Sequence, residues 1–289
     1  MKLEGRREST NVEDRRRMSG GQAAGLGIGG IAIVAIITLL MGGNLGDVLQ
    51  TVQNAGGIGG VTTETNYEPT AENEALATFS KQVLASTEDI WSAYFKQAGL
   101  GTYRNPTLVL YTGATSTSCG TGQAAMGPFY CSGDEKLYID LSFFSTMKQQ
   151  LGADGDFAYA YVIAHEVGHH VQNLLGTLGQ AHNQMARMNK TDSNRMSVRI
   201  ELQADFYAGV WAHYEDQVYK SLDDDDLMEA IKCAQVIGDD YLQKKAQGYA
   251  VEESFTHGTA AQRMRWLKKG ITTGDLRQGD TFSLSDSQL

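Results

Sequence analysis

Cysteine is scarce in this sequence, with three residues among 289. None of them shows the Cys-x-x-Cys spacing that is typical of thiolate zinc sites. Cys119 and Cys131 flank a loop rich in small residues, and Cys233 lies in a later helical stretch. We expect a disulfide between Cys119 and Cys131, worth about 2–3 kcal/mol in an oxidising compartment; the alternative is two separate buried thiols. Cys233 is expected to be a buried free thiol.

Net positive charge is also lacking. The formal charge is −10 at pH 7, although the first 20 residues hold six basic and four acidic side chains. The rest of the chain is therefore more acidic than the total suggests. Nucleic-acid binding relies on a basic surface, so we expect no nucleic-acid partner.

Lysine and arginine are absent from residues 18–80. Within that stretch, Ala23 to Met41 runs for 19 residues with one polar side chain, Thr38. A helix of this length spans about 28 Å, just enough for the apolar part of a bilayer. The alternative is a cleavable signal peptide, but no Ala-x-Ala site follows the apolar stretch. We therefore predict one transmembrane helix over residues 23–43.

The charges on either side of this span predict its orientation. Six basic residues precede it, and none follows until Lys81. The positive-inside rule then makes residues 1–22 a cytoplasmic basic segment and places the remaining chain across the membrane. Residues 44–70 are expected to form a flexible linker, 71–270 the folded domain and 271–289 a disordered tail.

Hydrophobic spacing predicts a mainly helical α+β domain with a small β element. The strand expected at 136–141 directly precedes the helix that carries the main polar motif. It is either an ordinary core strand or an edge strand to which a substrate peptide adds. The other elements expected are a strand over 107–111, helices over 74–97, 196–219, 227–245 and 260–269, and a helix from Asp154 or Asp156 to Gly176.

One motif interrupts the almost wholly apolar stretch from Phe157 to Leu175: His165, Glu166 and His169 form His-Glu-x-x-His. Positions four apart share one helix face, so His165 and His169 can bind one Zn2+ ion. Glu166 can then act as general base on a water at that ion. The alternative is a pair of packed core histidines, but buried ionisable groups need a partner or a metal. The motif therefore predicts a zinc peptidase.

A catalytic zinc site needs a third protein ligand. The pattern that continues to a third histidine is excluded, because Gln172 and Leu175 stand at the later positions. We predict Glu201, on a following helix, as the third metal ligand. Asp205 lies one turn later and is predicted to accept a hydrogen bond from the free N–H of a ligand histidine. The alternatives are His170, His213 or Asp205 as ligand, and a Glu201 that pairs with Arg195 or Arg199 on a solvated face.

A final polar group, Thr256-His257-Gly258-Thr259, precedes the last predicted helix. His257 is a candidate catalytic residue, because it or Arg263 can stabilise an oxyanion opposite the metal. A capping or core role is the alternative for both residues.

Together these motifs resemble the bacterial putative neutral zinc metallopeptidase family. The likeness implies a zincin-like peptidase domain that acts on a protein or peptide and is held outside the bacterial inner (cytoplasmic) membrane by a single-pass anchor. A non-enzymatic envelope protein that binds zinc or a partner is the alternative, but a structural zinc site needs no base at Glu166. The likeness extends to about Gly270 and is carried by Gly-Pro-Phe-Tyr-Cys (127–131), Asp-Leu-Ser-Phe-Phe (140–144), His-Glu-Val-Gly-His-His (165–170), Glu-Leu-Gln-Ala-Asp (201–205), Ala-Gly-Val-Trp-Ala-His (208–213) and Thr-His-Gly-Thr (256–259).

Overall fold

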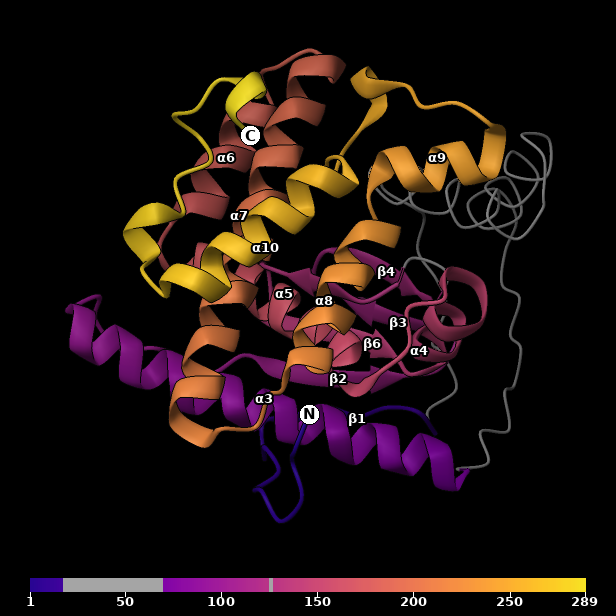
Figure 1. Cartoon of the computed structure of the whole chain (residues 1–289), viewed down its shortest axis with the longest axis vertical. Helices are drawn as coiled ribbons and strands as arrows, with labels where there is room; N and C mark the ends of the chain where they lie inside the picture. The colour runs from indigo at the N-terminus through magenta and orange to yellow at the C-terminus, as the bar shows by residue number, and fades with distance from the viewer. Residues whose placement is uncertain (18–69, 125–126) are drawn as a thin grey trace.

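The computed structural model describes residues 1–17, 70–124 and 127–289. The described chain is mainly helical with a small sheet, which confirms the predicted α+β class. In Figure 1, helix α3 runs along one edge of the molecule, with the sheet beside it and the remaining helices beyond. The helices are α3 (Ala71–Ala98), α4 (Ser142–Thr146), α5 (Asp156–Leu174), α6 (Thr177–Met185), α7 (Lys190–Tyr219), α8 (Asp224–Val236), α9 (Asp239–Gln247) and α10 (Ala260–Thr273).

The main sheet has four strands in the order β1-β2-β6-β5. Strands β1, β2 and β6 are parallel, and β5 runs antiparallel to β6. The predicted strand at 136–141 is therefore an interior strand, and β5 lies at the edge of the sheet. The loop predicted between Cys119 and Cys131 contains β4, which forms a separate two-stranded hairpin with β3. The strands are β1 (Val12–Asp14), β2 (Thr107–Tyr111), β3 (Ala114–Thr117), β4 (Gly120–Gln123), β5 (Phe129–Cys131) and β6 (Lys136–Asp140).

Helix α5 lies at the centre of the domain, and every side chain from Phe157 to Gln172 is buried. It contacts α3, α6, α7, α8 and β5. Of the two predicted start residues, Asp156 is the first residue of the helix, and Gly155 is its N-cap. A carboxylate oxygen of Glu229 accepts the N–H of Phe157 at 3.1 Å. The start of α5 is thus tied to α8, which the sequence pattern does not reveal.

Helix α7 begins at Lys190, six residues before the predicted start, after an Asn189 N-cap whose side chain accepts the N–H of Asp192. It crosses α5 closely at Gly168. A Cβ atom at that position would lie only 2.8 Å from the backbone oxygen of Ala204. The glycine therefore permits a helix crossing that a larger residue would push apart.

The helix predicted over 227–245 is wrong as a single element, since α8 and α9 are separated at Ile237 and Gly238. The break has a packing reason. A Cβ atom at Gly238 would lie 2.3 Å from the backbone nitrogen of Ala260, and the N–H of Asp239 donates to the oxygen of Gly258 at 2.9 Å. The chain turns here to pack against the start of α10.

Both ends of the described chain depart from the predicted domain boundaries. Residues 12–14 form β1 in the same sheet as β2 and β6, so residues 1–17 are not a segment apart from the domain. The C-terminal residues are not a free tail either. Thr281 and Leu289 are 0% and 3% exposed, and Arg199 of α7 donates to the backbone oxygens of Thr281 and Leu284.

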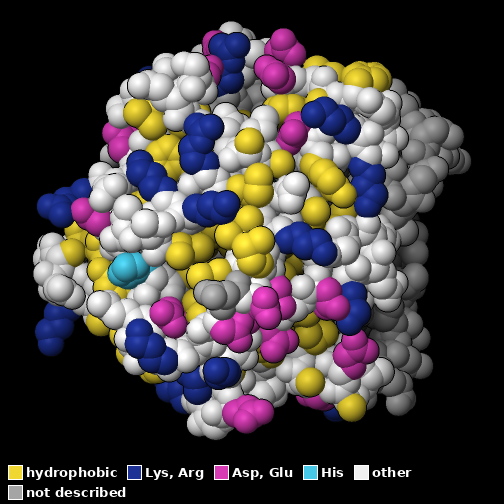
Figure 2. Space-filling model, in the orientation of Figure 1, with side chains coloured by type: hydrophobic (Ala, Val, Ile, Leu, Met, Phe, Trp, Pro, Cys, Tyr) yellow, Lys and Arg dark blue, Asp and Glu magenta, His cyan; other side chains and the backbone are white. Residues whose placement is uncertain are grey.

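The transmembrane helix predicted at 23–43 lies outside the described residues, as does the predicted linker except for Thr70, the N-cap of α3. Among the helices that the structure describes, none is both long and apolar enough to cross a membrane. On the face shown in Figure 2, the described basic side chains are scattered among acidic and hydrophobic ones and form no continuous basic surface.

Candidate metal centre

His165 and His169 lie one turn apart on α5, and their rings are 4.8 Å apart. Both side chains point toward Glu201 of α7, which the close crossing at Gly168 brings opposite them. The Nε2 atoms of His165 and His169 lie 3.1 Å and 3.6 Å from the two oxygens of Glu201. One ligand atom from each of the three residues lies within 4.8 Å of the others.

The hydrogen bonds behind the histidines decide which ring nitrogens face this point. The Nδ1 of His165 lies 2.8 Å from Asp205, and the Nδ1 of His169 lies 2.9 Å from the side-chain oxygen of Gln172. With Nδ1–H donating to an oxygen in each case, both Nε2 lone pairs point toward the Glu201 carboxylate. Two imidazole nitrogens and one carboxylate oxygen, with the histidines oriented from behind, are the donor set that zinc prefers in catalytic sites.

Asp205 is the hub of the network behind the site and is fully buried. Besides His165, its carboxylate accepts the hydroxyl of Tyr161 at 2.5 Å and two N–H groups of Arg263 at 2.8 Å each. Burial raises the pKa of Asp205, but Arg263 and His165 outweigh it and hold the pKa at about 2. Asp205 therefore accepts the predicted hydrogen bond from His165, and Arg263 supplies the counter-charge to its carboxylate.

Arg263 was a candidate for oxyanion stabilisation. Its side chain is 3% exposed, and it is engaged by Asp205 and by the hydroxyl of Tyr161 at 3.3 Å. The structure thus places Arg263 behind the candidate metal ligands, where it neutralises Asp205, and His257 remains as the candidate for oxyanion stabilisation.

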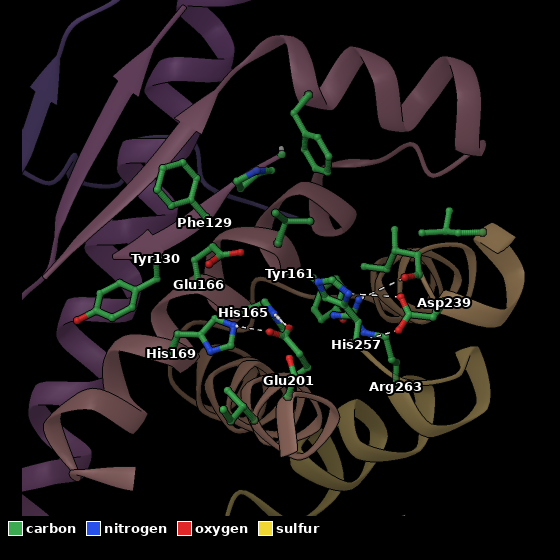
Figure 3. A pocket seen from close by; sticks show the side chains of 18 of the residues that line it. Phe129, Tyr130, Tyr161, His165, Glu166, His169, Glu201, Asp239, His257 and Arg263 are labelled. Carbon is green, nitrogen blue, oxygen red and sulfur yellow. Dashed lines mark hydrogen bonds and ion pairs between the residues drawn. The ribbon is translucent and has the colours of Figure 1, made fainter. Parts of the chain in front are cut away.

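Glu166 lies beside the ligand cluster and is 7% exposed. Burial raises its pKa, while the two neighbouring histidines oppose the shift. No described residue hydrogen-bonds its carboxylate, which lines a cavity of about 630 Å³. In Figure 3, Glu166 lies on one side of His165 and Glu201, and His257 lies on the other.

His257 lines the same cavity with a side chain that is 28% exposed. Asp239 holds it from behind: one carboxylate oxygen lies 3.4 Å from Nδ1 of His257, and the other accepts the backbone N–H groups of Thr256, His257 and Gly258. Burial lowers the pKa of His257, but Glu201 and Asp239 outweigh it and raise the pKa. Both carboxylates therefore favour the protonated form of the imidazole.

Two of the three alternative ligands, His170 and His213, lie away from the cluster, whereas Asp205 contacts the Nδ1 side of His165. His170 bonds the hydroxyl of Tyr130 and the backbone oxygen of Arg104, and His213 bonds the backbone oxygen of Ile271. The alternative pairing of Glu201 with arginine is not found either, since Arg195 and Arg199 both reach Asp286.

The cavity has an apolar lining on both sides of the cluster. Strand β5 supplies Phe129 and Tyr130 to one wall. A disulfide joins Cys131, at the end of β5, to Cys119 at the tip of the β3–β4 hairpin, and Cys233 is a buried free thiol. The remaining apolar side chains of the lining include Phe143, Leu151, Val162, Leu178, Met185, Ile200, Ile237 and Leu242.

Three supporting residues were missed by sequence analysis. Tyr161 and Gln172 share the face of His165 and His169 at spacings of four and three, so helix periodicity offered a signal for both. Asp239 offered none, because its place beside His257 depends on the break between α8 and α9.

Comparison with known proteins agrees with this geometry. The sequence profile of a family described as "Putative neutral zinc metallopeptidase" matches residues 1–282. The chain is 47% identical over 290 residues to the "Uncharacterized protein YpfJ" of Escherichia coli strain K12, which covers 99% of this chain and 100% of the relative. It is 43% identical over 194 residues to the "Uncharacterized protein Rv2575" of Mycobacterium tuberculosis strain H37Rv, which covers 64% of each chain. No solved structure matches the chain.

Proposed function

The chain belongs to the putative neutral zinc metallopeptidase family, and we propose that it is a zinc-dependent peptidase that holds its metal with His165, His169 and Glu201. The observation that carries the proposal is the convergence of two Nε2 atoms and one carboxylate beside Glu166. A structural zinc site is closed by four protein ligands, whereas a catalytic site keeps one position open. Among the described residues, only these three donors meet.

Zinc bound at these residues would supply a Lewis acid that polarises a peptide carbonyl and activates water near neutral pH. Glu166 takes the proton of the attacking water and delivers it to the leaving amine. Its burial supports this role, because a raised pKa brings a carboxylate closer to the pH at which it must both accept and release a proton. His257, held by Asp239, donates a hydrogen bond to the oxyanion from the opposite side of the cavity.

The cavity walls support a peptide as substrate. Strand β5 is at the edge of the sheet, and its residues Phe129 and Tyr130 line the cavity next to the motif. An extended peptide can add to such an edge through main-chain hydrogen bonds and place side chains in flanking pockets. The apolar lining favours hydrophobic side chains near the cleaved bond.

The non-enzymatic alternative has less support. A zinc-binding protein without peptidase activity needs no buried carboxylate beside the ligands, and burying one without a partner is unfavourable. Glu166 is a buried carboxylate beside the proposed ligands, and no described residue hydrogen-bonds it.

We also propose that the domain works outside the cytoplasm of a bacterial cell. The disulfide between Cys119 and Cys131 supports this location, because such bonds persist in oxidising compartments. Anchoring by residues 23–43 stays a prediction, since those residues are outside the described part of the chain.

The deciding experiment compares the wild type with Glu166→Gln, which keeps the size and the metal ligands but removes the base. Zinc content should be unchanged, and cleavage of a broad peptide library should fall about 10²–10⁴-fold. Equal cleavage by both proteins would remove Glu166 from the mechanism. A zinc-loaded wild type that cleaves nothing in the library would favour the non-enzymatic alternative.

A further inference from the structure

Two carboxylates buried inside the domain find partners in residues 1–17. Glu88 of α3 is 3% exposed, and one of its oxygens accepts the hydroxyl of Ser9 at 2.6 Å and the side-chain amide of Asn11 at 2.7 Å. Glu215 of α7 is 0% exposed and forms an ion pair with Arg6. Because a buried carboxylate without a counter-charge is strongly disfavoured, the interior of the domain is built to receive these N-terminal residues.

Backbone hydrogen bonds fix the same segment along the sheet. The N–H of Leu108 donates to the oxygen of Asn11 at 2.9 Å, and the N–H of Arg15 donates to the oxygen of Leu110 at 2.7 Å. Without this strand, β2 would be the edge of the sheet, although Leu108 and Leu110 are fully buried. A hydrophobic strand left at an edge in this way is exposed to unwanted pairing.

Side-chain contacts continue from β1 to the cavity wall. Glu13 pairs with Lys136 of β6 at 2.5 Å, and the guanidinium of Arg15 lies 5.9 Å from the ring centre of Tyr138. Tyr138 stacks on Phe129 of β5 with 4.9 Å between ring centres, and Phe129 lines the cavity. The N-terminal strand therefore supports the strand that forms one wall of the proposed peptide site.

Four of the basic side chains that predicted a cytoplasmic N-terminus are used inside this arrangement. Their partners are acidic residues of the same fold, so these charges no longer act as free charges at a membrane surface. The ion pairs are Arg6 with Glu215, Arg7 with Glu88 and Asp89, Arg15 with Glu13, and Arg16 with Asp14 and Glu74.

We propose that residues 1–17 are a constitutive strand of the catalytic domain and lie on the same side of any membrane as the active site. A single membrane crossing between residue 17 and residue 70 would separate β1 from β2 and remove the N-terminal partners of Glu88 and Glu215. The orientation predicted from the charge pattern, with the N-terminus in the cytoplasm and the domain across the membrane, is incompatible with this fold.

Labelling of the full-length protein in cells tests the proposal. Two variants, each with one added cysteine, are compared: Thr10→Cys in the N-terminal segment and Met228→Cys in α8, both at exposed positions. Each is treated with a membrane-impermeant maleimide before and after the membrane is permeabilised, and the wild type controls for the native cysteines. The two positions should show the same labelling pattern, whichever side it reports. Labelling of Met228→Cys but not Thr10→Cys in intact membranes, with both labelled after permeabilisation, would overturn the proposal.

A second measurement tests the docking itself on the purified full-length protein. Arg6→Met leaves buried Glu215 with the hydroxyls of Ser86 and Ser221 but without its cationic partner, and should lower Tm by roughly 10 °C. Arg17→Met is the control, because it removes a basic side chain of the same segment at an exposed position. Replacing both Arg6 and Glu215 by methionine should recover part of the loss. A Tm of Arg6→Met that is no lower than the Tm of Arg17→Met would show that the segment is not part of the folded domain.

Discussion

The Nδ1 atom of His165 lies 2.8 Å from a carboxylate oxygen of Asp205, so a residue of α7 sets the orientation of a proposed metal ligand on α5. The same carboxylate is neutralised by Arg263 of α10. Three helices thus meet at one buried ion-pair network behind the candidate metal centre. Changes to this network should alter metal binding without touching the ligands themselves.

Adjacent histidines on α5 offer a matched test of the metal ligands. His169→Ala should lose the bound zinc, because one of the three donors disappears. His170→Ala should keep one zinc per chain, since His170 bonds Tyr130 and Arg104 and faces away from the cluster. Metal analysis of the purified proteins checks both. Zinc at wild-type level in His169→Ala would contradict the ligand assignment.

The stability of the metal-free protein should depend on pH through His165. Burial lowers the pKa of His165, but Asp205 and Glu201 outweigh it and raise the pKa from 6.5 to about 10. The stability from protonated His165 is complete below pH 6.5 and is lost as the pH rises through about 10. Tm of the metal-free protein should fall over this range, and zinc affinity should rise because zinc displaces the proton. Asp205→Asn should weaken both trends; a flat Tm profile in the wild type would refute the coupling.

Variants of His257 and Asp239 should distinguish the proposed catalytic role of His257 from the positioning role of Asp239. His257→Ala removes the proposed oxyanion donor and should lower kcat about 10²–10³-fold with little change in KM or zinc content. Asp239→Asn should cost less and should shift the pH profile of kcat, because it removes a carboxylate that raises the pKa of His257. Steady-state kinetics across pH distinguish the two variants. An unchanged kcat in His257→Ala would leave His257 with a structural role only.

Gly168 should be required for the helix crossing that brings Glu201 to the histidines. In Gly168→Ala the new methyl group would meet the backbone oxygen of Ala204 at 2.8 Å, and we expect a loss of about 1–3 kcal/mol in unfolding free energy together with weaker zinc binding. Gly179→Ala on α6 is the control, because its Cβ would meet nothing within 4 Å. That variant should be stabilised by about 0.5–1 kcal/mol. Denaturant unfolding measures both, and equal effects would contradict the packing argument.

Sequence alone was sufficient where a relation spans one turn of a helix. His165 and His169 had to share a face once the segment was helical, and Glu166 had to flank them. The helix predicted at 74–97 is similarly local, and the structure ends it at Gly99, which has φ 67°. The orienting contact of Gln172 with His169 is also local, so the same periodicity could have found it.

Tertiary structure decided everything that depends on two elements meeting. Glu201 reaches the histidines because Gly168 lets α7 approach α5, and Asp239 reaches His257 because the chain breaks at Gly238. The edge position of β5 and the docking of β1 depend on strand order, which hydrophobic alternation does not encode. Buried Glu88 and Glu215 read as ordinary helix residues in the sequence. Only packing shows that their partners lie at the far N-terminal end of the chain, because side-chain periodicity describes neighbours within a few residues and not the pairing of buried charges across a fold.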